Sequence, residues 1–280
     1  MSNPLHATLF GSCLVRRPIR SAARAKDVLG YDGYGPLPAL HSFGEMIQAI
    51  EVLRGQKTIP QDLWPLCHVK RNFGGEADPA IVTGLDLALI EPSLPVDLLF
   101  RGHFINRDAI KQLVLRPIVE KASGNLPRQW MQKGLMDLDE AARKKAAEEL
   151  GRYIEGDDEE SARARTVLFE TRALPADLAM GFRRMKEMLA CPIGAVVYTF
   201  RVMPDGRPVS WPPGFREAVI AAAGAENLPM FETTGMIRTF GVDKAFSRDM
   251  RHYSDAFEPV VGEALLQFAE KICATARAGA

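Results

Sequence analysis

The sequence lacks several features that mark particular classes of protein. Its 35 basic residues are balanced by 35 acidic ones, so no net charge draws the chain toward nucleic acid or an anionic membrane. No apolar run reaches the ~20 uninterrupted residues that a membrane span needs. The first residues also lack the basic segment and apolar run of a secretory signal. We therefore expect a cytoplasmic protein that binds no nucleic acid and has no membrane span.

Cysteine is scarce as well. The four cysteines are widely separated, with no C-x-x-C pair and no dense framework, which predicts reduced thiols. One set of side chains suggests zinc: Cys67, His68, His41 and His103. Their spacings match no regular ligand pattern, so structural histidines are the favoured interpretation. We expect no metal and no cofactor.

The organisation of the chain is that of one globular domain. No internal repeat or low-complexity segment occurs, which excludes solenoids and arrays. A chain of 280 residues, 47% of them hydrophobic, is long enough for an α/β domain that carries an insertion. Helix-forming sequence dominates residues 107–190. We predict a single domain over residues 1–280, with a helical insertion or cap at 107–190.

Four short apolar runs, each ended by glycine, proline or polar residues, predict buried strands. They lie at residues 7–10, 85–91, 194–200 and 229–232. Apolar residues at helical spacing predict helices after Ser42, over 215–223 and over 256–276. This alternation predicts an α/β fold with a parallel sheet, and the carboxyl edge of such a sheet is where sites form.

Two short motifs carry the residues of a serine esterase. Ser12 follows the first strand, beside a glycine that permits close approach of a substrate, although a serine there also serves as a helix cap. Asp249 and His252 precede the last helix, and their three-residue spacing lets the carboxylate orient the imidazole; these two side chains alternatively decorate the start of that helix. A doubly wound sheet brings both segments to one rim, which predicts a triad of Ser12, His252 and Asp249.

Together the motifs resemble the SGNH or GDSL-type hydrolase superfamily, and most closely its divergent Gly-Ser-Cys branch, such as the GSCFA family. Gly11-Ser12-Cys13 matches the first block of that branch, and Asp249-Met250-Arg251-His252-Tyr253-Ser254 matches the last. The resemblance implies a three-layer, flavodoxin-like α/β fold. It also implies that Ser12 attacks an ester while His252 removes its proton. The enzyme is an esterase if water accepts the acyl group, and an O-acyltransferase if a second hydroxyl accepts it.

The donors that would stabilise an oxyanion are harder to identify. Typical members of the superfamily use a Gly-x-Asn-Asp block, and this sequence has none. We assign one donor to the backbone N–H of Ser12 and nominate Asn106 as the other, with the strand exit at Thr199 or Arg201 as an alternative. The missing block also supports a different function, a non-catalytic carbohydrate-binding or scaffold protein that retains the hydrolase fold.

Other residues near these motifs have two interpretations each. Cys13 is either a thiol nucleophile or, as favoured, a small apolar packing residue. Arg16 and Arg17 either grip an anionic sugar or phosphate group or lie on a solvated face. Tyr31 and Trp211 either stack on sugar rings or pack within their loops. The expected binding set for an acylated small molecule or carbohydrate is Arg16, Arg17, Tyr31, Arg201 and Trp211.

Overall fold

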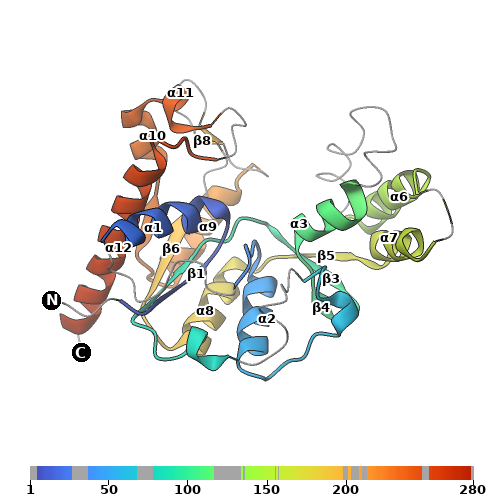
Figure 1. Ribbon diagram of the computed structural model, residues 1–280, viewed down its shortest axis with the longest axis horizontal. Coiled ribbons are helices and arrows are strands. Elements are labelled where there is room, and N and C mark those ends of the chain that lie inside the picture. Colours follow the sequence, from blue (N-terminus) through green and yellow to red (C-terminus); the bar gives the residue numbers. More distant parts are fainter. Residues whose placement is uncertain are drawn as a thin grey trace.

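The computed structural model describes residues 5–26, 37–67, 78–116, 134, 136–154, 156, 158–197, 201–202, 208–209, 213–247 and 252–278. Figure 1 shows two parts side by side: a parallel sheet with helices on both faces, and a smaller antiparallel sheet with its own helices. Among the described helices, none combines the length and apolar composition needed to cross a bilayer.

The centre of the fold is a four-stranded parallel sheet with the order β1-β2-β6-β9. Its strands are β1 (Ala7–Phe10), β2 (Leu87–Ile90), β6 (Ile193–Val197) and β9 (Met230–Glu232). Every residue of β1, β2 and β6 is buried, because helices cover both faces of the sheet. All four predicted strands are confirmed, with β1 at its predicted bounds; residues 198–200 of the third lie outside the described residues.

Alternate residues of each strand face opposite helical layers. Leu87 and Leu89 pack with α1 (Cys13–Lys26) and α12 (Glu258–Ala278) on one face. Ala88 and Ile90 pack on the other face with α2, α8 and α9. The bounds of those three helices are Phe43–Leu53, Leu178–Leu189 and Phe215–Ala225. The fold is therefore a three-layer α/β arrangement (Figure 1).

The second sheet, of order β4-β3-β5, is antiparallel. Its strands are β3 (Val96–Phe100), β4 (His103–Phe104) and β5 (Arg172–Pro175). The helices near it are α3 (Arg107–Ile110), continued by the π-helical turn η4 (Lys111–Leu115), α6 (Glu140–Gly151) and α7 (Glu159–Glu170). The 107–190 stretch thus contributes a strand to this sheet, and through α8 it also covers a face of the main sheet.

The remaining elements are short. They are the 3₁₀ turns η1 (Gln61–Leu63) and η3 (Pro79–Val82), the hairpin of β7 (Arg201–Val202) and β8 (Pro208–Val209), and the helices α10 (Thr234–Phe240) and α11 (Val242–Ala245). In the flavodoxin order the first strand lies inside the sheet, whereas β1 is at the edge of the described sheet. The α/β class is as predicted, and the flavodoxin order is not matched by the described strands.

Candidate functional site

The candidate site lies at the carboxyl edge of the main sheet, where β1 and β2 end together. The parallel register pairs Phe10 with Ile90, and the N–H of Glu91 donates to the carbonyl oxygen of Phe10 over 2.8 Å. Residues 37–42 cross this edge, because Leu40 N–H donates to Gly11 O (3.3 Å) and Ser93 N–H donates to His41 O (2.8 Å). Three segments distant in sequence therefore meet at one place.

Ser12 stands between β1 and α1, as predicted, and is buried with 5% exposure. Its backbone N–H donates to Glu91 Oε2 over 2.8 Å, and its side chain lies close enough to the Glu91 carboxyl group to lower the pKa of that group. Ser12 Oγ accepts the N–H of Leu14 at 3.2 Å, which is the contact of a helix cap. Ser12 thus caps α1 and also lies against the carboxyl group of Glu91.

Glu91 is a buried carboxyl group with 2% exposure. Burial raises its pKa to about 7, while the hydrogen bonds from Ser12 oppose that rise. Gly11 makes room for it, because a Cβ atom at Gly11 would lie 2.7 Å from Glu91 Cβ and 3.1 Å from Oε2. Burial and the nearby Glu91 charge also raise the pKa of the Cys13 thiol, which disfavours a thiolate at this position.

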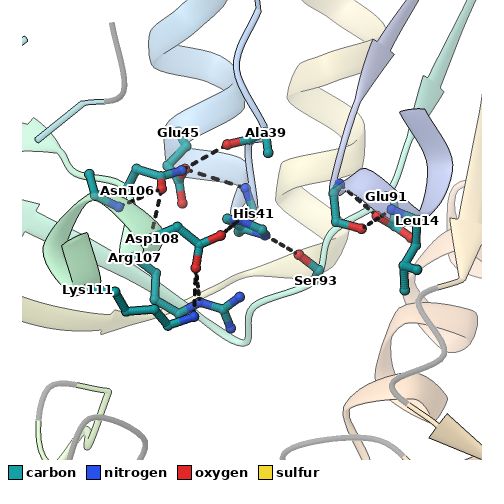
Figure 2. Close-up of polar contacts among 12 residues, drawn as sticks. Leu14, Ala39, His41, Glu45, Glu91, Ser93, Asn106, Arg107, Asp108 and Lys111 are labelled. Carbon is teal, nitrogen blue, oxygen red and sulfur yellow. Dashed lines mark hydrogen bonds and ion pairs between the residues drawn. The ribbon is translucent and has the colours of Figure 1, made fainter. Parts of the chain in front are cut away.

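A hydrogen-bonded chain of Ser93, His41 and Asp108 lies beside this pair (Figure 2). His41 Nδ1 is 2.8 Å from Ser93 Oγ, and His41 Nε2 is 3.0 Å from Asp108 Oδ2. Burial lowers the pKa of His41. Burial acts to raise the pKa of Asp108, but His41 and the cations Arg107 and Lys111 outweigh it and hold this pKa far below its usual range.

With Asp108 ionised and His41 neutral, the two hydrogen bonds of His41 allow one placement of the protons. An ionised Asp108 only accepts, so Nε2 of the neutral His41 carries the hydrogen. Nδ1 then only accepts, and the Ser93 hydroxyl donates to it. These hydrogen bonds join the segments before α2 and after β2 to the start of α3, with His41 and Ser93 buried and Asp108 partly exposed.

Asn106 is fully buried and serves as the N-cap of α3. Its Oδ1 accepts the N–H groups of Asp108 (2.9 Å) and Ala109 (3.2 Å). Its Nδ2 donates to Ala39 O (2.9 Å) and Glu45 Oε2 (2.6 Å), which uses both hydrogens of the amide. The nomination of Asn106 as an oxyanion donor therefore needs correction, since this amide has a structural task instead.

Replacement Asn106→Ala is expected to destabilise the fold by about 2 to 4 kcal/mol. The loss combines a helix cap, worth about 1 kcal/mol, with a buried Glu45 carboxyl deprived of a donor, which costs about 1 to 3 kcal/mol. Asp139→Ala is the matched control, because Asp139 is an exposed N-cap of α6. Urea unfolding measures both variants, and equal losses would contradict the contribution assigned to Glu45.

The carboxyl-terminal motif is described only in part. Asp249 lies outside the described residues, whereas His252 lies within them. Tyr253 OH hydrogen-bonds to Thr233 Oγ1 over 3.2 Å, which ties this segment to the residue that follows β9. Arg17 of α1 pairs with Glu258, the first residue of α12, at 3.1 Å. The starts of α1 and α12 therefore meet, and the approach of His252 to Ser12 stays a prediction.

The predicted substrate contacts are also described in part. Arg16 donates to the carbonyl oxygen of Leu37, which holds the segment that crosses the sheet edge. Arg17 is about half exposed and forms the ion pair with Glu258. Arg201 is the first residue of β7. Tyr31 and Trp211 lie outside the described residues. Within the described part of the chain, no three His, Cys, Asp or Glu side chains are grouped to hold a metal ion.

Comparison with known proteins identifies the family. A model of the TviD N-terminal domain matches residues 5–268, almost the whole chain. The chain belongs to the TviD N-terminal domain family. No curated protein and no solved structure matches it, and the resemblance to SGNH and GDSL hydrolases rests on the two motifs alone. In this TviD-family chain the matched region includes both motifs, the Ser12–Glu91 pair, and the hydrogen-bonded residues Ser93, His41 and Asp108.

Several residues of this TviD-family site were not predicted from the sequence. In the sequence, Glu91 is the last residue of a predicted strand, and Asp108 belongs to no recognisable motif. His41 was interpreted as a structural histidine, which agrees with its buried, fully bonded ring. A signal for Asn106 was present, because an asparagine just before a helical run is a typical N-cap.

Proposed function

We propose that this chain is a serine esterase or O-acyltransferase in which Ser12 attacks the acyl carbonyl of an acylated carbohydrate or small molecule. The observation that carries the proposal is the position of Ser12, between the carboxyl end of β1 and the start of α1. In parallel α/β sheets, ligands bind at this edge. Membership of the TviD family supports a polysaccharide-modifying role, so a carbohydrate is the favoured acyl carrier.

In the proposed reaction the Ser12 oxygen bonds to the carbonyl carbon while His252 takes the hydroxyl proton and Asp249 orients the imidazole. The leaving alcohol receives that proton and departs, which leaves an acyl group on Ser12. Water then releases the acyl group in an esterase, whereas a sugar hydroxyl accepts it in an acyltransferase. The same residues serve both outcomes.

The oxyanion needs donors other than those expected from the sequence. The Ser12 N–H is bonded to Glu91, and both hydrogens of Asn106 are bonded elsewhere. We therefore assign this task to the amino-terminal end of α1, where the helix dipole favours negative charge. The N–H groups of Leu14, Val15 and Arg16 already bond to Ser12, so the dipole, and not these amides, carries the assignment. Arg16 and Arg17 lie within the first turns of the same helix and are proposed to attract an anionic part of the substrate.

The test is hydrolysis of p-nitrophenyl acetate and butyrate by wild type and by Ser12→Ala. Turnover that disappears with the hydroxyl supports the proposal. Equal background rates in both proteins would support the second candidate, a non-catalytic carbohydrate-binding or scaffold protein. That candidate is favoured by one observation, the engagement of the Ser12 N–H with Glu91.

Replacement Cys13→Ala is expected to leave turnover within about twofold of wild type. The thiol is half-buried, and burial together with Glu91 raises its pKa, so little thiolate forms at neutral pH. Initial rates with p-nitrophenyl acetate measure the effect. A loss of a hundredfold or more, with the fold intact by circular dichroism, would reassign the nucleophile to Cys13.

A further inference from the structure

The Ser12–Glu91 pair contains a group that the proposed mechanism leaves unused. Glu91 is 2% exposed, and a buried carboxylate is costly unless it is paired or coordinated. At the carboxyl group of Glu91, the described hydrogen bond comes from the backbone N–H of Ser12 at 2.8 Å, and the Ser12 side chain also acts on this group. No described salt bridge involves Glu91, although other acidic side chains nearby, such as Asp108, are paired with cations.

The backbone geometry fixes this arrangement. Glu91 directly follows β2, and its N–H donates to Phe10 O, so the parallel ladder places it opposite the residues that follow β1. Gly11 is the residue that allows the close approach, because any side chain there would overlap Glu91 Cβ. Two neighbouring strands therefore hold the carboxyl group and the hydroxyl in one register.

We propose that Glu91 is the group that receives the proton of the Ser12 hydroxyl, so that the two residues form a serine–carboxylate pair. This inference rests on the proposed function for the nucleophile and the reaction, and it replaces His252 as the group that takes the hydroxyl proton and returns it to the leaving alcohol. A general base must lie within hydrogen-bond reach of the proton that it removes. Glu91 is placed for this role, because its Oε2 lies 2.8 Å from the Ser12 backbone nitrogen and the Ser12 side chain interacts with the same carboxyl group.

The proton balance of the step is simple. As the Ser12 oxygen forms its bond to the ester carbonyl carbon, the hydroxyl proton passes to Glu91 and gives a carboxylic acid. When the tetrahedral intermediate collapses, the bond to the leaving alkoxide breaks, and Glu91 returns the proton to it. The products are a free alcohol, an acyl group on Ser12 and an ionised Glu91, ready for the second half of the reaction.

The electrostatic surroundings of Glu91 suit this role. Burial raises the pKa of Glu91 to about 7, and a base is most effective when its pKa is near the working pH. At the start of α1, the charges of Glu91, Arg17 and Asp108 all act on the Cys13 thiol. His41, Ser93 and Asp108 satisfy one another on the adjoining segments. Ionisation of Glu91, and with it activity, is expected to rise as the pH passes through about 7.

The experiment compares Glu91→Gln with wild type across pH 5 to 9, using p-nitrophenyl acetate. Glutamine keeps the size of the side chain and an oxygen for the Ser12 N–H, but it cannot take a proton at neutral pH. We expect kcat to fall by about 10² to 10⁴-fold with little change in KM, and the rise in activity near pH 7 to disappear. Glu45 is also a buried carboxyl group, and it accepts a hydrogen bond from Asn106. Burial raises the pKa of Glu45 to about 8, so Glu45→Gln is the matched control. It should retain activity.

Each outcome has one meaning. A Glu91→Gln protein that stays within about threefold of wild type, while Ser12→Ala is inactive, would overturn the role of Glu91 and leave the proposed function standing. A loss shared equally by Glu45→Gln would show a structural effect and also overturn it. Turnover that survives in Ser12→Ala would remove the proposed function itself. A His252→Gln variant that keeps the pH 7 rise, which Glu91→Gln loses, would support the inference.

Discussion

Replacement Ser12→Ala is expected to lower kcat/KM for p-nitrophenyl acetate by about 10³-fold or more. The reason is chemical, since the hydroxyl oxygen forms the covalent bond to the acyl group and alanine offers no nucleophile. Binding of the substrate needs no hydroxyl, so KM should change little. Steady-state rates, with the background rate subtracted, measure both quantities.

The control for this prediction is Ser93→Ala. Ser93 follows β2 as Ser12 follows β1, and both serines are 5% exposed, so the two substitutions remove the same group from similar surroundings. Ser12→Ala also removes a helix cap, which costs about 1 kcal/mol, and thermal unfolding separates that effect from catalysis. Activity that survives in Ser12→Ala but disappears in Ser93→Ala would move the nucleophile to the chain of Ser93, His41 and Asp108.

Replacement Gly262→Ala is expected to destabilise the protein by about 3 kcal/mol or more. A Cβ atom at this position of α12 would lie 2.2 Å from Pro18 O and 2.9 Å from Ala22 Cβ. The first of these atoms belongs to the backbone of α1, so no side chain rotation relieves the overlap. The two helices must separate, and the shift should also disturb Ser12 and lower turnover.

The matched control is Gly224→Ala in α9. An added Cβ atom there meets nothing within 4 Å, so the substitution should be neutral or stabilise the helix by about 0.5 to 1 kcal/mol. Urea unfolding of both variants gives the comparison. A Gly262→Ala protein as stable as Gly224→Ala would contradict the close crossing of α1 and α12.

The strands of the parallel sheet and the helices α2, α9 and α12 that cover it were predictable, because their signals are local. Ala7–Phe10 is an apolar run that stops at a glycine, and α2 begins after Ser42, whose side chain accepts the N–H of Glu45. The antiparallel sheet was missed. β3 follows Pro95 closely, and β5 pairs with it from a distance of more than seventy residues along the chain, a contact that no local pattern encodes.

The candidate site shows the same division. Ser12 at the end of a strand was predictable from Phe10-Gly11-Ser12, since the residue order alone puts the hydroxyl there. Glu91 was not, because the pairing that brings it to Ser12 depends on the register of β1 against β2. The contact of His41 with Asp108 joins residues 67 positions apart, and it arises only when α2 and α3 meet at the sheet edge.

The most direct test of the central claim is covalent labelling with a fluorophosphonate, followed by peptide mass mapping of the modified residue. Such a reagent forms its adduct on a serine oxygen that is activated by a neighbouring base. The adduct is predicted on the peptide that carries Ser12, with none in the Ser12→Ala protein. An adduct on Ser93, or an unlabelled wild-type protein that is folded, would contradict the assignment of Ser12 as the nucleophile.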